Sequence, residues 1–108
     1  MRYNKVHAER KYAMIKHIVM YTLREDCNKQ AAIEEIRQAL ESLVGVVPGL
    51  IRMQIRPTLG GEFDYVLYSV FENSDALNNY KTHPAHLAVK PIVHGYIASR
   101  VAADFIGE

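Results

Sequence analysis

The segment IKHIVMYTL, residues 15–23, does most to decide the fold. Its β-branched and aromatic residues favour a strand, and both of its alternate faces are largely apolar. One face carries His17, Val19, Tyr21 and Leu23, and the other carries Ile18 and Met20. A strand of this composition is buried on two sides, so both faces of the sheet around it must be covered.

An amphipathic helix is predicted downstream of this strand. From Ala32 the apolar residues recur at spacings of three and four, at Ile33, Ile36, Leu40, Leu43, Val44 and Val47. This spacing predicts a helix of about four turns. Pro48 and Gly49 are expected to end it, because proline disfavours helix in the residue before it and glycine tolerates a chain reversal.

Three more strands are predicted in the rest of the chain. In residues 51–56, Ile, Met and Ile alternate with Arg, Gln and Arg, which indicates a strand with one wet face or edge. After the turn sequence PTLGGEF, residues 64–71 (DYVLYSVF) form another aromatic and β-branched strand. Residues 96–106 again alternate and are expected to be the last strand.

A second helical region lies between the last two of these strands. Ser74 is a suitable N-cap for it, and Leu77, Tyr80 and Leu87 form its apolar side. Pro84 and Pro91 are expected to divide it into two short pieces, about 75–82 and 84–92, because proline interrupts a helix.

The predicted order, β-α-β-β-α-β, is that of an α+β ferredoxin-like fold, with a four-stranded antiparallel sheet and both helical regions on one face. The other face would then expose Ile18, Met20 and one side of residues 64–71 as a contiguous apolar patch. A second sheet must cover it. An identical chain is the simplest source, since two-fold homodimers are the commonest assemblies.

Composition limits the classes of function. The chain has 108 residues, enough for one domain, and a formal net charge of +1 without a basic cluster that would indicate nucleic-acid binding. The lone Cys27 cannot form an internal disulfide, and no long apolar run indicates a membrane span. We expect a cytoplasmic protein in which residues 1–13 are a disordered or tag-like segment and residues 14–108 are the domain.

A histidine-rich stretch, YKTHPAHLAVKPIVHGY at residues 80–96, is the candidate site. His83 and His86 lie three residues apart, which places both on one side of a helical turn, and Tyr80 can share that side. Imidazole can transfer protons near neutral pH, and a phenol can donate to a developing oxyanion. The alternative is that these imidazoles only cap or cover the helix. His94 is expected to be a cation at a helix end.

Other chemistries lack support in the sequence. The stretch has no HExxH spacing and no carboxylate between residues 76 and 103, so we expect no metal. No phosphate-binding glycine loop is present, so we expect no cofactor. His17, within an apolar strand, needs a polar partner or a water-containing pocket beside it.

The motifs KHIVMYTL, VVPGL, DYVLYSVF, ENSDALNNY, THPAH and SRVAADF together resemble the stress-responsive A/B barrel domain (Dabb) family, from about Met14 to Ile106. The resemblance implies a protomer that pairs with an identical chain, sheet on sheet, in a dimeric α/β barrel. Some plant members are polyketide cyclases, in which the histidine matching His86 is the general base and the tyrosine matching Tyr80 assists it. Leu40 stands where those cyclases have an aromatic residue with a hydroxyl.

The resemblance also assigns places to other residues of a pocket between helices and sheet. It implies that His17 lines this pocket and that His83 orients a ligand. We therefore expect a homodimer that binds a small apolar or aromatic ligand, with the catalytic residues His86, Tyr80 and His17, and with binding residues Val19, Tyr21, Leu40 and His83. Such a site would suit a cofactor-free lyase, cyclase or isomerase. The alternatives are a non-catalytic stress-response dimer and a cofactor-independent monooxygenase.

Overall fold

The computed structural model describes residues 13–107, and residues 1–12 of the expected N-terminal segment lie outside this range. The elements, in order, are β1 (Ile15–Leu23), α2 (Lys29–Glu41), β2 (Leu50–Pro57), β3 (Tyr65–Phe71), α3 (Ser74–Thr82), α4 (Pro84–Tyr96) and β4 (Ile97–Ile106). With α3 and α4 as the second helical region, this is the predicted β-α-β-β-α-β order. The ferredoxin-like fold is confirmed.

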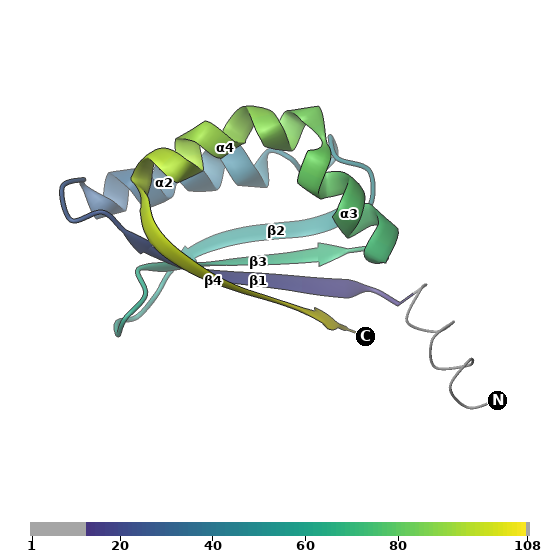
Figure 1. Cartoon of the computed structure of the whole chain (residues 1–108), viewed down its shortest axis with the longest axis horizontal. Coiled ribbons are helices and arrows are strands. Elements are labelled where there is room, and N and C mark those ends of the chain that lie inside the picture. Colours follow the sequence, from purple (N-terminus) through teal and green to yellow (C-terminus); the bar gives the residue numbers. More distant parts are fainter. Residues whose placement is uncertain (1–12, 108) are drawn as a thin grey trace.

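The sheet has the strand order β2-β3-β1-β4, and each neighbouring pair is antiparallel. The three helices lie on one face of it (Figure 1). The core lies between them and the sheet, and its fully buried side chains include Val19 of β1, Ile36 of α2 and Phe71 of β3. Strand β1 lies inside the sheet, and its residues Val19 and Leu23 are buried on the helical side, whereas Met20 on its other face is exposed.

Helix α2 is shorter than predicted, because it ends at Glu41 and not at Pro48. Residues 42–46 form turns, and Gly45 has a φ of 89°. After Glu41 the backbone tightens, with Leu43 N–H bonded to the Leu40 carbonyl, and the left-handed conformation of Gly45 then turns the chain away from the helix direction. Leu43 and Val47 are still buried although this turn is not helical, whereas Val44, predicted on the same apolar face, is exposed.

The N-cap of α3 is Asn73, and the prediction of Ser74 was wrong by one residue. The Asn73 side chain accepts a hydrogen bond of 2.9 Å from the backbone N–H of Ala76. Asn and Ser cap helices about equally well, so the sequence alone could not choose between neighbours. Asn28 caps α2 in the same way.

Helix α4 continues through Pro91 to Tyr96, beyond the predicted end at residue 92. A proline inside a helix removes one hydrogen bond, here the one that the Leu87 carbonyl would accept. Leu87 and Pro91 are both exposed, so water can bind this carbonyl and the cost is reduced. At the other end Pro84 occupies the first helical position, as predicted.

The helices differ in what they pack against. Helix α2 packs on β2, and α3 packs on β2 and β3, whereas α4 packs mainly against α2 and α3. Helix α4 therefore spans the sheet at a distance, as the arrangement in Figure 1 also shows. This arrangement leaves room beneath α4 for a cavity.

The opposite face of the sheet carries the predicted apolar patch. In the strand register Ile18 lies opposite Tyr68 and Ala103, and Met20 lies opposite Val66 and Val101. Met20, Val101 and Phe105 are exposed large apolar side chains on this outer face. No described element covers them within residues 13–107.

Candidate functional site

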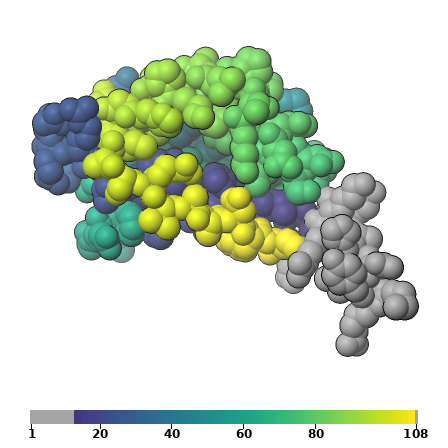
Figure 2. Space-filling view, in the orientation of Figure 1, coloured from purple at the N-terminus to yellow at the C-terminus, as the bar shows by residue number. Residues whose placement is uncertain are grey.

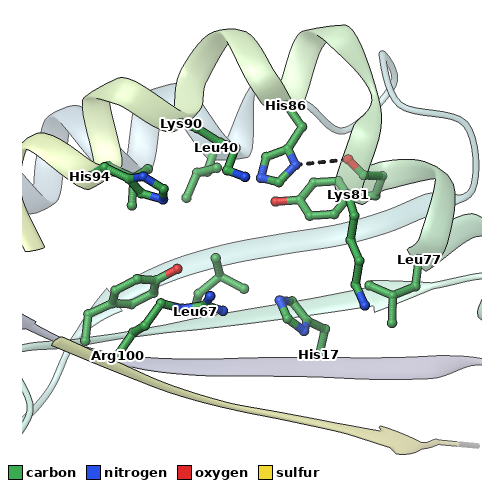
Figure 3. A pocket seen from close by; sticks show the side chains of 12 residues that line it. His17, Leu40, Leu67, Leu77, Lys81, His86, Lys90, His94 and Arg100 are labelled. Carbon is green, nitrogen blue, oxygen red and sulfur yellow. Dashed lines mark hydrogen bonds between the residues drawn. The ribbon is translucent and has the colours of Figure 1, made fainter.

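A cavity of about 290 Å³ lies between the sheet and α4. In the space-filling view β1 is visible between the helices α3 and α4 and the strand β4, so the molecule is hollowed along this side (Figure 2). Five of the predicted site residues line the cavity together (Figure 3): His17, Tyr21, Leu40, Tyr80 and His86. Strand β1 and helix α2 from the first half of the chain meet α3 and α4 from the second half here.

Two predicted binding residues do not line the cavity. Val19 is fully buried in the core below it. His83 is the N-cap of α4, where its Nδ1 accepts a hydrogen bond of 3.0 Å from the backbone N–H of Ala85. The capping interpretation therefore describes His83, and its neighbour His86 is the one that reaches the cavity.

The tautomer of His86 follows from its hydrogen bond. Its Nδ1 lies 3.0 Å from the backbone carbonyl oxygen of Tyr80, drawn as a dashed line in Figure 3. A carbonyl oxygen only accepts, so Nδ1 carries the proton and donates it. In the neutral ring Nε2 is then the unprotonated nitrogen, which can act as a base.

Tyr80 and His86 are held face to face. Their ring centroids are 4.0 Å apart and their planes differ by 16°. Phe71 supports the other side of Tyr80, with ring centroids 5.1 Å apart. Burial raises the pKa of the Tyr80 phenol above its ordinary value, so the hydroxyl stays protonated and can donate a hydrogen bond.

The environment of His86 favours its neutral form. Burial lowers the pKa of this imidazole from its ordinary value of 6.5, and the hydrogen bond to Tyr80 acts in the opposite direction. The positive charge of Lys90 lowers the pKa further. At neutral pH the ring is therefore mainly uncharged, as a general base requires.

His17 has the polar partner that its place in an apolar strand predicts. Its Nδ1 is hydrogen-bonded to the carboxylate of Asp104, which lies directly opposite in the β1–β4 ladder. The carboxylate accepts from Nδ1–H and so orients the ring. Asp104 was missed, because the sequence predicts that alternate β4 residues share a face but not which β1 residue each one meets.

The floor of the cavity is aromatic and basic. Tyr21 stacks on Tyr65 of β3, with centroids 4.5 Å apart and planes 9° apart. The Arg100 guanidinium lies 6.0 Å from the Tyr21 ring centre, within the range of a cation–π contact. The Tyr65 hydroxyl is buried, and it has no hydrogen-bond partner in the part of the chain that the structure describes.

Sequence reasoning missed several other cavity residues, among them Lys81, Lys90, His94 and Arg100. Lys90 follows His86 by four residues inside the predicted piece 84–92, so helical spacing could have found it. His94 follows by four more residues, and the helix end expected at residue 92 concealed it. Arg100 could not be found without the register of β4.

The described residues also bear on metal sites and membrane spans. Among residues 13–107, no group of three or more histidine, cysteine or acidic side chains could hold a metal ion. None of the described helices has the length and apolar character needed to cross a membrane.

The fold and cavity define a ferredoxin-like α+β protein with a cavity of about 290 Å³ under its last helix. The family described as Stress responsive A/B Barrel Domain, Dabb, matches residues 15–106. The chain belongs to this family, as the resemblance of its motifs predicted. No curated protein sequence matches the chain.

Solved structures share the architecture. A dimeric protein of unknown function with a ferredoxin-like fold, from Bacteroides fragilis, is 29% identical, with a TM-score of 0.78 over 87% of this chain and 96% of that one. The hydroxynitrile lyase from Passiflora edulis is 17% identical, with a TM-score of 0.78 over 90% and 95%. SnoaB, a cofactor-independent oxygenase from Streptomyces nogalater, is 14% identical, with a TM-score of 0.74 over 89% and 94%. The last two likenesses show the fold alone.

Proposed function

We propose that the protein is a homodimeric enzyme that binds a small aromatic carbonyl compound and transfers a proton from carbon without a cofactor. The observation that carries the proposal is the bond from His86 Nδ1–H to the Tyr80 carbonyl, which leaves Nε2 as the basic nitrogen at the cavity. The lowered pKa of His86 keeps this nitrogen unprotonated near neutral pH.

In the proposed step, His86 Nε2 removes a proton from the carbon next to the substrate carbonyl. The electron pair of the C–H bond moves to the carbonyl oxygen, which gives an enolate and an imidazolium. The Tyr80 hydroxyl, which faces the same cavity, donates a hydrogen bond to the enolate oxygen. His17, oriented by Asp104, is the second candidate donor. Return of the proton from the imidazolium to a different carbon completes an isomerase step. In an aldol or cyclase step the enolate carbon instead attacks a second carbonyl, and the imidazolium gives its proton to the alkoxide that forms.

The fold of the relatives supports this class of activity without selecting a reaction. A hydroxynitrile lyase and a cofactor-independent oxygenase are both built on it in other organisms. Leu40 at the cavity is apolar, so this wall favours an apolar part of a ligand. No feature of the described residues favours the oxygenase alternative over proton transfer.

The homodimer is supported by the outer face of the sheet. Met20, Val101 and Phe105 are exposed there. Met20 lies opposite Val101 of β4 on one side and opposite the apolar Val66 of β3 on the other. A soluble monomer rarely leaves such a face bare. The related protein from Bacteroides fragilis is dimeric. We infer that two sheets of this chain pack face to face.

Hydrogen–deuterium exchange at carbon tests the proton transfer directly. Acetophenone in D₂O slowly exchanges its methyl hydrogens, and NMR measures this rate with and without the protein. The wild type is expected to accelerate exchange, and His86→Gln is expected to lose about 10²- to 10⁴-fold of the acceleration, as removal of a general base does. Tyr80→Phe is expected to lose part of it, since only a hydrogen bond to the enolate is removed.

His83→Asn is the matched control, because asparagine can cap α4 as His83 does and His83 does not line the cavity. This variant should exchange acetophenone at the wild-type rate. An unchanged rate in His86→Gln would exclude His86 as the base. Absence of any acceleration by the wild type would favour the alternative of a non-catalytic dimer.

A further inference from the structure

The cavity concentrates positive charge. Lys81, Lys90 and Arg100 all line it, and no Asp or Glu is among its lining residues. The whole chain has a formal net charge of only +1, so three cations at one small cavity do not follow from a generally basic protein. Within residues 13–107, none of the three forms an ion pair.

The three cations enter the cavity from different elements. Figure 3 shows Lys90 extending from α4 beside His86, Arg100 reaching in from β4 below, and Lys81 descending from α3 near His17. The nearest carboxylate on the cavity side of β4, Asp104, is already bonded to His17. Like charges around one space repel each other, and an anion placed between them relieves the repulsion.

Lys90 and Arg100 are placed to act together. Lys90 is half-buried and follows His86 by one helical turn, and its charge is close enough to affect that imidazole. The Arg100 guanidinium is held beside the Tyr21 ring, which limits the number of conformations it must give up on binding. A planar guanidinium matches the two oxygens of a carboxylate, and a lysine adds a point charge.

We propose that the ligand is an anion, namely an aromatic carbonyl compound that also carries a carboxylate. Arg100 and Lys90 bind the carboxylate, and the aromatic ring lies between the apolar walls, which include Leu40 and Leu67. The carbonyl end then lies toward Tyr80 and His86. This inference rests on the proposed function, because it assigns the substrate class of the same cavity.

The test compares two molecules that differ in charge and little in shape. 4-Acetylbenzoate carries a carboxylate, and methyl 4-acetylbenzoate is its neutral ester. Calorimetric titration of the full chain with each compound gives the two dissociation constants. We expect 4-acetylbenzoate to bind about ten- to a hundred-fold more tightly than the ester, the usual effect of hydrogen bonds to a charged group.

Charge-removing variants locate the carboxylate. Arg100→Gln and Lys90→Gln are each expected to weaken binding of 4-acetylbenzoate by about ten-fold or more and to leave binding of the ester almost unchanged. Arg52→Gln is the matched control, because Arg52 is an exposed arginine on β2, at the opposite edge of the sheet from β4. It should leave both constants unchanged.

The outcomes separate this inference from the proposed function. Equal binding of ester and acid would contradict the proposed anion site, and so would a preference for the acid that Arg100→Gln and Lys90→Gln leave intact. Neither result would contradict binding of an aromatic carbonyl compound in the cavity. If neither compound binds, the substrate class and the aromatic-carbonyl proposal both fail. A charge preference that both cavity variants abolish and Arg52→Gln keeps would support the inference.

Discussion

Two histidines three residues apart have different roles. His83 caps a helix through Nδ1, and His86 donates from Nδ1 to a carbonyl and keeps Nε2 free. The sequence predicted that both lie on one side of a turn, but not which nitrogen each would use. That depends on backbone direction at the helix start, where His83 has extended dihedral angles and His86 is already helical. Local spacing identified the right pair of residues, and hydrogen-bond geometry distinguished them.

At this scale we predict the titration of His86. Burial and the charge of Lys90 both lower its pKa, so NMR of the ring should give a midpoint below 6.5. The proton-transfer rate should therefore rise with pH through that midpoint and stay level above it. In Lys90→Gln the midpoint should move upward, because a charge that disfavours the imidazolium has been removed. A midpoint unchanged by this substitution would show that Lys90 does not act on His86.

Helix α3 is positioned by a close approach to the chain before β2. Gly49 has a φ of 80°, and a Cβ added there would lie 2.5 Å from the Ala76 Cβ of α3. Only glycine permits both the conformation and the contact. Tyr80 is one turn further along the same helix, so this contact helps to place a side chain that lines the cavity. The sequence predicted the helix end near Gly49 but not the packing against α3, since that contact joins distant segments.

We predict that a comparison of Gly49→Ala with Gly45→Ala separates the cost of backbone strain from the cost of steric overlap. Gly45 has a similar φ of 89°, but an added Cβ there meets nothing within 4 Å. Gly45→Ala should lower the free energy of unfolding by about 1 kcal/mol from backbone strain alone. Gly49→Ala should lose roughly 1–3 kcal/mol more from overpacking. Urea unfolding measures both, and equal losses would show that α3 adjusts freely.

The element order and fold class were predictable, because hydrophobic period and turn residues are local properties. Register was not. A bulge between Leu50 and Arg52 exposes Ile51, although simple alternation places it with the buried Met53 and Ile55. The same limitation hid Asp104 and Arg100, which meet His17 and Tyr21 only through the pairing of β1 with β4.

For the whole molecule, the decisive feature is a sheet with two different faces. The helical face encloses the core and cavity, and the outer face exposes apolar side chains at its centre and along β4. This division was predictable from the sequence alone, because β1 carries apolar residues on both of its sides. A homodimer buries the outer face and leaves the cavity on the other side of each sheet.

We predict that Met20→Glu, which adds a charge to the middle of the outer face, dissociates the dimer. Sedimentation at micromolar concentration should show a dimer for the wild type and a species of half its mass for the variant, since an unpaired charge at an interface is costly. Val46→Glu, at an exposed residue in the turn after α2, should stay dimeric. A wild-type monomer would contradict the proposed assembly.

The bulge where β4 begins has a consequence for how the chain can evolve. Thr22 pairs with Ser99 and Leu23 with Ile97, so Ala98 is an extra residue in the ladder. Because side chains alternate along a strand, the extra residue lets Ile97 share the inner face with Arg100, three positions later. Deleting Ala98 would leave Ile97 opposite Leu23 and Ser99 opposite Thr22, now as neighbours in a regular ladder, so Arg100 and Asp104 would keep their face. A codon lost at Ala98 therefore preserves the two faces of β4, whereas a codon lost further along the strand would exchange them for every residue beyond it.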